Sequence, residues 1–309
     1  MKSYKIAVLT PISHIEGLKD LIKSKGEVWF LEEGTKSEAR SLLIDQKIDT
    51  IICNPNQQSY IIDEELLTDT NVSFINTCST GTNHLDLEFL KSKNIKVESL
   101  KTDLDLLENL PSTSELALTL TLCLLRKIVP SVLHTMDYKW NYLPFTGRMA
   151  SELTLGLIGY GRLGKIMHRI SQNLFKNIIV YDPFISCPNS VSFEELLNTS
   201  DVISLHVHVK KDTINMINRN SIKKMKKKPL IINTSRGEIV DEKSIIEALE
   251  KNLISGYGAD VIVDEYGTVE KSPILEAMNN GMNIIVTPHT GGMTKEGQEM
   301  AFKYAFNKL

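Results

Sequence analysis

Three ionisable side chains each follow an apolar, strand-like run and could together move a proton and hold an anion. They are Arg236, Glu265 and His289. The planar guanidinium of arginine matches a carboxylate through two parallel hydrogen bonds. Histidine exchanges a proton near neutral pH, and a nearby carboxylate orients it and stabilises its cation. Each residue alone is also typical of a surface ion pair, a loop acid or a turn histidine, so the hypothesis requires that the fold bring them together.

A glycine-rich turn supplies a candidate dinucleotide site. The motif Gly159-Tyr160-Gly161-Arg162-Leu163-Gly164 follows the apolar run 153–158 and opens a helical pattern over 162–174. In such motifs the first glycine makes a tight turn, the second lets the backbone approach a pyrophosphate, and the third lets helix and strand pack closely. The N-terminus of the helix adds N–H groups that no helix carbonyl occupies and the positive end of the helix dipole.

Asp182 strengthens this interpretation, because glycine-rich turns alone are common. It ends the next apolar run, 178–181, and lies 18 residues after Gly164. A carboxylate at that place can accept the hydroxyls of an adenosine ribose, although an acid in an ordinary turn would look the same. No Lys or Arg occurs over 183–209 to meet a 2′-phosphate. The pattern therefore predicts NAD, rather than NADP, as the cofactor.

The elements that must position these groups read as an α/β protein with two parallel-sheet domains. Short apolar runs alternate with helical patterns along the chain. The expected strands are 5–9, 28–31, 50–53, 72–75, 95–100, 153–158, 178–181, 202–205, 230–233, 255–259 and 283–286. Repeated strand–helix–strand units give parallel sheets with helices on both faces. Ligands bind at the carboxyl ends of such strands, where Arg236, Glu265 and His289 are expected.

Two helices can be placed from their patterns. Ser13 and Glu16 predict a capping box that begins the first helix, and Gly26 is expected to end it. Apolar residues are so dense over 112–127 that this second helix should be mostly buried. Beyond it lies an aromatic segment with Tyr138, Trp140, Tyr142 and Phe145. That segment is either a packed surface loop or an arm between subunits, since aromatic residues are enriched at interfaces.

Composition excludes several classes of protein. Of the 309 residues, 42% are hydrophobic and the net charge is −3, which excludes a disordered chain and predicts neither nucleic acid nor membrane as a partner. The lysine-rich run 223–228 could be a nucleic-acid patch, but it is more typical of a solvated helix end. No run approaches the roughly 18 uncharged apolar residues of a spanning helix. Four widely spaced cysteines argue against a zinc or disulfide framework, and a cytoplasmic location is expected.

Together these residues resemble the D-isomer-specific 2-hydroxyacid dehydrogenase family. The order and approximate spacing agree from about Ile75 to Thr294, some two thirds of the chain. The matching residues are Ser79-Thr80-Gly81 with Asp86, Glu115, Trp140, the glycine motif, Asp182, His206, Asn233-Thr234-Ser235-Arg236-Gly237, Asp260-Val261, Glu265, and Thr287-Pro288-His289 with Gly292 and Thr294.

The resemblance implies an NAD-dependent oxidoreductase that interconverts a D-2-hydroxy acid and its 2-oxo acid by hydride transfer. His289 would be the general acid/base, Glu265 its carboxylate partner, and Arg236 the anchor of the substrate's carboxylate and carbonyl. The residues implied in cofactor binding are Gly159, Gly161, Arg162, Leu163, Gly164, Asp182, His206, Thr234, Ser235, Arg236, Asp260 and His289, with Asp260 on the nicotinamide carboxamide. Substrate binding would use Ser79, Thr80, Gly81 and Arg236.

The family also implies a domain arrangement. A flavodoxin-like substrate domain would comprise 1–105 and 287–309, and a Rossmann domain for NAD would comprise 106–286. Members of the family pair through their dinucleotide domains, so a homodimer is expected. Two positions depart from the family pattern: Tyr266 replaces a proline, and His206-Val207-His208 replaces His-x-Pro. Both changes could alter the pocket wall or the seating of the nicotinamide. Substrate choice is expected in loops such as 54–60, which suggests either a polar pocket or a solvated loop.

Other functions fit parts of the pattern. A nonenzymatic NAD(H)-sensing protein or corepressor could keep the same fold and the same three ionisable residues. A short-chain reductase needs a Tyr-xxx-Lys pair, and Tyr304 with Lys308 supplies one only at the C-terminal end, outside the predicted dinucleotide domain. His206 and His208 alternate onto one strand face as metal ligands do, but no third ligand converges on them, so no metal is predicted.

Overall fold

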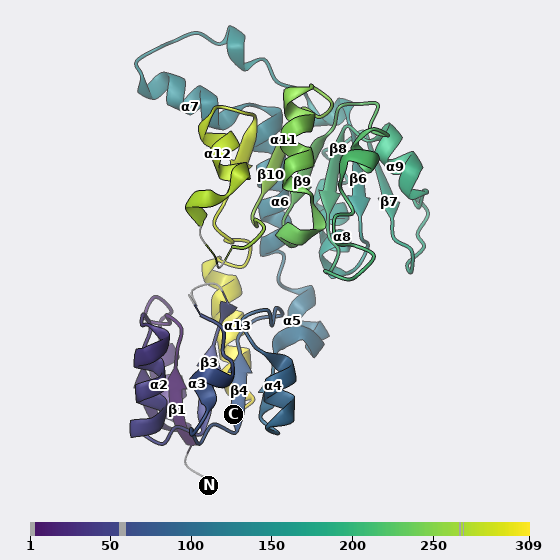
Figure 1. The fold of residues 1–309 in the computed structure, drawn as a ribbon. Coiled ribbons are helices and arrows are strands. Elements are labelled where there is room, and N and C mark those ends of the chain that lie inside the picture. Colours follow the sequence, from purple (N-terminus) through teal and green to yellow (C-terminus); the bar gives the residue numbers. More distant parts are fainter. Residues whose placement is uncertain (1–3, 56–59, 266, 268) are drawn as a thin grey trace. The chain divides into compact units, whose positions relative to one another are not determined.

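The computed structural model describes residues 4–55, 60–265, 267 and 269–309. The chain forms two compact units (Figure 1). The first comprises Met1–Leu110 with Met293–Leu309, and the second comprises Pro111–Gly292. These divisions fall five and six residues beyond the expected boundaries at 105 and 286. The second shift has a physical cause, because hydrogen bonds from the segment 287–291 to Asp260 keep that segment in the second unit.

The first unit contains a five-stranded parallel sheet in the order β2-β1-β3-β4-β5. The strands are β1 (Tyr4–Val8), β2 (Gly26–Phe30), β3 (Thr50–Cys53), β4 (Phe74–Thr77) and β5 (Lys96–Glu98). Its helices are α1 (Leu18–Lys23), α2 (Lys36–Asp45), α3 (Glu64–Leu67), α4 (Leu87–Ser92), α5 (Leu104–Glu108) and α13 (Lys295–Asn307). One core packs α1 and α13 against the sheet, and a second core packs α2, α3 and α4.

The second unit contains a six-stranded parallel sheet in the order β11-β10-β9-β8-β6-β7. The strands are β6 (Thr154–Ile158), β7 (Asn177–Tyr181), β8 (Val202–Leu205), β9 (Leu230–Asn233), β10 (Gly256–Ala259) and β11 (Ile284–Val286). Its helices are α6 (Ser112–Leu125), α7 (Ile128–Met136), α8 (Arg162–Ser171), α9 (Phe193–Thr199), α10 (Arg219–Ile222), α11 (Glu242–Glu250) and α12 (Pro273–Asn279). The order reverses between β6 and β8, the place where open α/β sheets bind dinucleotides.

Alternate side chains of the central strands enter two cores, which confirms that helices cover both faces of this sheet. Ile231 of β9 joins the core formed with α9, α11 and α12, whereas Leu230 and Ile232 join the core formed with α6 and α8. The predicted burial of the helix over 112–127 is confirmed, since Ala117, Leu120 and Leu124 are all buried, although α6 ends at Leu125. The expected α/β architecture with two parallel sheets is thus confirmed.

The predicted start of the first helix is wrong. Helix α1 begins at Leu18, after Gly17 in the left-handed region at φ +73°, and no side chain caps it. Ser13 does not form a capping box, because its backbone N–H donates to the Glu32 carboxylate, 3.1 Å away. Gly26 does not end the helix either, because it is the first residue of β2. A Cβ there would lie 2.1 Å from the Tyr4 carbonyl oxygen, so the glycine permits close strand pairing.

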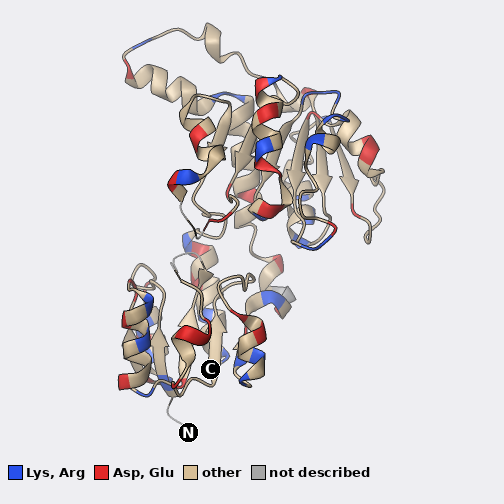
Figure 2. Ribbon diagram, in the orientation of Figure 1, with Lys and Arg blue, Asp and Glu red and all other residues tan. Residues whose placement is uncertain are grey.

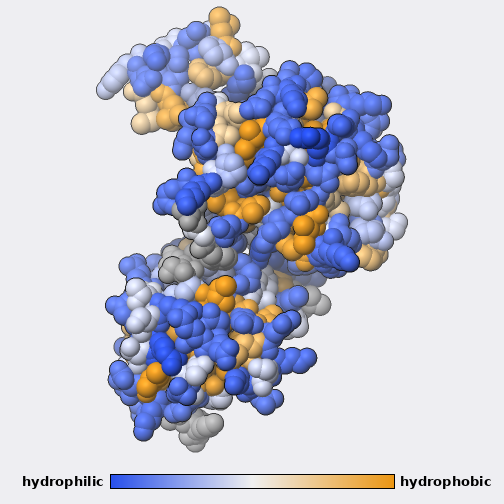
Figure 3. Space-filling view, in the orientation of Figure 1, coloured by the Kyte–Doolittle hydropathy of each residue, from blue (hydrophilic) through white to orange (hydrophobic). Residues whose placement is uncertain are grey.

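Helix α7 and the aromatic segment after it are unusually exposed. No residue of α7 is buried, and the helix carries no Lys, Arg, Asp or Glu (Figure 2). Hydrophobic side chains lie on its surface (Figure 3). Tyr138 is 100% exposed and Trp140 is 93% exposed. In the described part of the chain, no single helix has the length and apolar content to cross a membrane. One bent pair, Leu106–Leu125 with Ile128–Met136, meets that test by length and composition alone.

Candidate active site

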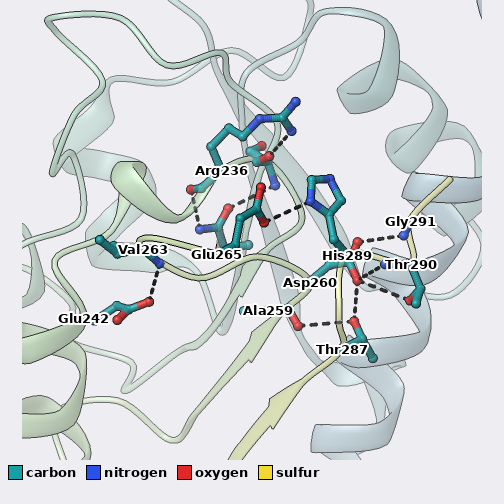
Figure 4. Close-up of polar contacts among 12 residues, drawn as sticks. Arg236, Glu242, Ala259, Asp260, Val263, Glu265, Thr287, His289, Thr290 and Gly291 are labelled. Atoms are coloured by element: carbon teal, nitrogen blue, oxygen red, sulfur yellow. Dashed lines mark hydrogen bonds and ion pairs between the residues drawn. The ribbon is translucent and has the colours of Figure 1, made fainter. Parts of the chain in front are cut away.

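His289 and Glu265 form a hydrogen-bonded pair in the second unit. The His289 Nδ1 and Glu265 Oε2 atoms are 2.9 Å apart, and the two side chains are 23% and 17% exposed (Figure 4). His289 follows β11 and Glu265 follows β10, so the neighbouring strands deliver them to one edge of the sheet. Because Nδ1 is engaged by the carboxylate, Nε2 is the ring nitrogen that can face a reactant. This is the geometry of an oriented acid/base.

The backbone around His289 is held in a sparsely populated conformation. His289 has φ +54°, which costs energy for a residue with a Cβ and persists only where the surroundings fix it. Asp260 provides that fixation. Its carbonyl oxygen accepts from the His289 N–H, and its carboxylate accepts from Thr287 Oγ1, Thr290 N and Gly291 N at 2.6–2.7 Å. Asp260 is 1% exposed. Thr290 Oγ1 is a fourth donor to this carboxylate, at 3.3 Å. The expected contact of Asp260 with the nicotinamide carboxamide stays a prediction.

Arg236 lies close to the same pair in Figure 4, beyond the end of β9. Its Nη1 donates to the Ser235 carbonyl oxygen at 2.7 Å, which leaves most of the guanidinium donors for an anion. Asn233 fixes the backbone here, because its Nδ2 donates to the Arg236 carbonyl oxygen and its Oδ1 accepts from the Ser235 N–H. Thr234 is buried in the same turn. The structure therefore brings Arg236, Glu265 and His289 together.

The glycine motif has the shape that a pyrophosphate needs. Gly159 has φ +94°, and a Cβ there would lie 2.4 Å from the His206 carbonyl oxygen. At Gly164 a Cβ would lie 2.1 Å from the Gly159 carbonyl oxygen, so both outer glycines permit close packing within the protein. At Gly161 a Cβ would meet nothing within 4 Å. The open space beside Gly161, at the N-terminus of α8, fits the approach of a dinucleotide phosphate.

Asp182 lies at the end of β7, oriented by three backbone N–H groups. Its Oδ2 accepts from Tyr160, and its Oδ1 accepts from Phe184 and Ile185, at 2.7–3.0 Å. A carboxylate offers about four lone-pair sites, so it retains room for a ribose hydroxyl. Lys210 Nζ lies 5.2 Å from the centre of the Phe184 ring. The search for basic residues over 183–209 missed this cation, because Lys210 is the first residue after that range and the fold places it beside Phe184.

His206 and Arg162 lie at the glycine motif, since His206 approaches Gly159 and Gly164 and Arg162 belongs to the motif. His206 Nε2 lies 3.0 Å from Ser204 Oγ. Burial lowers the pKa of His206 to about 4, so its ring is neutral near pH 7 and is a poor proton donor there. Burial also lowers the pKa of Arg162. The Leu163 carbonyl oxygen accepts from Ser114 Oγ at 3.0 Å and links the glycine motif to α6. Among the described residues, no group of three His, Cys, Asp or Glu side chains could hold a metal ion.

The predicted substrate loop, Ser79-Thr80-Gly81, belongs to the first unit and follows β4. Ser79 Oγ donates to the Gly81 carbonyl oxygen at 2.7 Å and lies 2.9 Å from Thr77 Oγ1. Thr77 Oγ1 in turn lies 3.1 Å from Nε2 of the buried His84, whose pKa is lowered by burial to about 4. Sequence reasoning did not find His84, and no catalytic spacing marks it. Tyr266 and most of the loop 54–60 lie outside the described residues.

The family is decided by a match over more than half of the chain. Residues 118–291 match the model of the D-isomer specific 2-hydroxyacid dehydrogenase NAD-binding domain. The chain belongs to this family. It is an NAD-dependent 2-hydroxyacid dehydrogenase, which interconverts a 2-hydroxy acid and a 2-oxo acid by hydride transfer. Asp182 and the glycine motif, which fit a dinucleotide, lie within the matched residues.

Several curated proteins are similar to this dehydrogenase. A hydroxypyruvate reductase of Thermotoga maritima is 32% identical over 234 residues, which cover 74% of this chain and 73% of that protein. A glyoxylate reductase of Thermococcus litoralis is 30% identical, with 88% and 82% covered. A D-3-phosphoglycerate dehydrogenase of Archaeoglobus fulgidus is 30% identical over 95% of this chain, which spans only 54% of that longer protein.

Solved structures share the fold over nearly the whole chain. An NAD-dependent formate dehydrogenase of Staphylococcus aureus, in complex with NAD, superposes with a TM-score of 0.82 at 25% identity, over 98% of this chain and 93% of that one. The apo D-lactate dehydrogenase of Escherichia coli gives a TM-score of 0.82 at 24% identity, over 98% and 94%. The dehydrogenase therefore has both parallel-sheet units of its structural relatives.

Proposed function

We propose that this dehydrogenase reduces a short 2-oxo acid to the D-2-hydroxy acid, with His289 as proton donor. The 2.9 Å contact between His289 and Glu265 supports the proposal most directly, because it joins a proton donor to the carboxylate that stabilises its cation. NADH, held by the glycine motif and Asp182, would supply the hydride for the carbonyl carbon. His289 Nε2 gives its proton to the carbonyl oxygen, while Glu265 stabilises the imidazolium and Arg236 holds the substrate carboxylate.

The names of similar proteins favour a small substrate. Relatives at 32% and 30% identity are a hydroxypyruvate reductase and a glyoxylate reductase. Both are named for short, polar 2-oxo acids, so we propose the same class for this chain. A screen of 2-oxo acids of increasing chain length, followed by NADH consumption, tests the proposal. Turnover that is highest with two- and three-carbon acids supports it. NADH binding without turnover of any acid would favour a nonenzymatic NAD(H) sensor.

We expect NADH to bind at least about 10-fold more tightly than NADPH. The Asp182 carboxylate would lie near the 2′-position of the adenosine, where a 2′-phosphate meets like charge. Titration of both cofactors by quenching of protein fluorescence measures the difference. Asp182→Ser should reduce the difference between the two affinities, because it weakens the binding of NADH and removes the charge that repels NADPH. Asp212→Ser, a matched change at an exposed site, should leave the ratio unaltered. Equal affinities in the wild type would contradict the assignment of Asp182.

We also propose a homodimer in which α7 and the aromatic segment 138–145 bury their apolar side chains. Leu133, Met136 and Trp140 are 57%, 69% and 93% exposed, and apolar patches of this kind mark interfaces. Light scattering at micromolar concentration should give twice the mass of the chain. Leu133→Asp should halve that mass, because it places a charge in the interface. Ile214→Asp, at an exposed apolar site elsewhere on the unit, should not. A monomeric wild type would rule the dimer out.

A further inference from the structure

Glu265 lies on a segment whose backbone is fixed by contacts with residues 237 and 242. Two residues before it, the Val263 N–H donates to Oε1 of Glu242 at 2.9 Å (Figure 4). Gly237 packs against the same segment, since a Cβ there would lie 2.2 Å from the Ile262 carbonyl carbon and oxygen. Asp264, between Val263 and Glu265, has φ +59° and turns the chain. These contacts fix the backbone of the segment that carries Glu265.

Glu242 is an unusual residue for this task, because it is 6% exposed. Taking a carboxylate out of water is costly unless hydrogen bonds or charges compensate. Burial raises the pKa of Glu242; the hydrogen bond from Val263 opposes this, and the nearby Asp241 adds to it. Among the described residues, the groups that act on this pKa are Val263 and Asp241, and neither is a cation. As the first residue of α11 it gains from the helix dipole, but the hydrogen bond that its carboxylate accepts comes from Val263, outside the helix.

The same carboxylate belongs to a buried cluster that also reaches Arg236. Tyr257 of β10 is fully buried, and its hydroxyl makes no hydrogen bond to the described residues, although Asn233 and Glu242 are near enough to act on its pKa. Burial raises the pKa of Tyr257, the Asn233 side chain opposes this, and the Glu242 charge adds to it. Asn233 donates to the Arg236 carbonyl oxygen at 2.9 Å. Asn233 and Glu242 thus hold the backbone segments that carry Arg236 and Glu265, respectively.

We infer that Glu242 is a positioning residue that holds Glu265 within hydrogen-bond distance of His289. The inference rests on the proposed role of His289 as proton donor. Loss of the Val263 tether would let the segment drift, and a displacement of about 1 Å at a reacting centre can lower the rate about 100-fold. The imidazolium of His289 would then lack its fixed counter-charge. The other charged groups close to that ring are Arg236, from the loop after β9, and Asp260, from the end of β10.

Glu242→Ala should lower kcat for 2-oxo acid reduction by about 10–100-fold, with KM for the oxo acid and NADH affinity within about threefold of the wild type. The reduction rate should fall off at a lower pH than in the wild type, because the imidazolium of His289 would lack its fixed counter-charge. Glu242→Gln keeps an acceptor for the Val263 N–H and should restore kcat to within about threefold. Glu250→Ala makes the same change at the exposed end of α11 and should have no effect.

A purely structural role would lower thermal stability without moving the pH profile, so a wild-type profile in Glu242→Ala overturns the inference. Equal loss in Glu242→Gln and Glu242→Ala overturns it as well, since the hydrogen bond would not be the cause. If Glu242→Ala does not fold, Glu242→Asp draws the acceptor back by one methylene and should shift the profile in the same direction; an unshifted profile there also overturns it.

An NMR titration of the His289 imidazole separates this inference from the proposed function, because it needs no substrate. The ring should take up its proton at a lower pH in Glu242→Ala than in the wild type, and identical titrations would overturn the positioning role. A wild type that turns over no 2-oxo acid would count against the proposed function alone.

Discussion

Replacement of His289 by alanine is expected to lower the turnover of 2-oxo acid reduction by about 10²–10⁴-fold, the usual contribution of a general acid. Another histidine of the second unit, His206 after β8, is held neutral by burial, which lowers its pKa to about 4. It therefore cannot supply the proton efficiently near neutral pH. NADH should still bind, because the glycine motif and Asp182 lie on other loops. Steady-state kcat with one confirmed substrate, and NADH titration of the same sample, measure both effects.

The matched control is His14→Ala, at an exposed histidine of the first unit, which should leave kcat unchanged. A His289→Ala protein with near-normal turnover would place the acid elsewhere. His208, on the exposed loop after β8, would then be the next candidate, followed by His206.

The sequence predicted the sheets well because their strands are short β-branched runs between clear breaks. The strands over 50–53, 202–205 and 230–233 match the observed bounds, and every expected strand is present. The first helix was placed wrongly for a long-range reason. Ser13 has the local pattern of a cap, but the Glu32 carboxylate, which follows β2, takes its N–H. A local pattern cannot show a partner that only the folded sheet brings near.

The part of the candidate site that directly follows strand ends could be predicted from the sequence. Arg236, Glu265 and His289 each follow a strand, so parallel pairing alone brings them to one edge. Glu242 could not be found this way, because in the sequence it is an ordinary acid at a helix start. Its contact with Val263 exists only because β9 and β10 are neighbours and their following loops meet.

Arg236→Lys should lower kcat/KM for the 2-oxo acid by about 10²–10³-fold, with a higher KM and a lower kcat. Lysine keeps the positive charge but presents a point donor in place of the planar fork. Each charge-assisted hydrogen bond contributes about 1.5–3 kcal/mol, and loss of the paired geometry forfeits most of two such bonds. The substrate would then bind weakly and with its carbonyl turned away from His289. The measurement is steady-state kinetics over a range of oxo acid concentrations, with NADH affinity determined separately.

Arg219→Lys provides the control, because Arg219 makes a two-oxygen contact with Glu247 on the exposed surface of the same unit. The chemical change is identical, so any general effect of losing a guanidinium appears in both variants. Only Arg236→Lys should change KM for the oxo acid, and its NADH affinity should stay close to that of the wild type. If instead Arg236→Lys weakened NADH alone and left KM for the oxo acid unchanged, the guanidinium would serve the cofactor. The substrate carboxylate would then need another anchor, for which the backbone N–H groups of Ser79-Thr80-Gly81 are the candidates that the family implies.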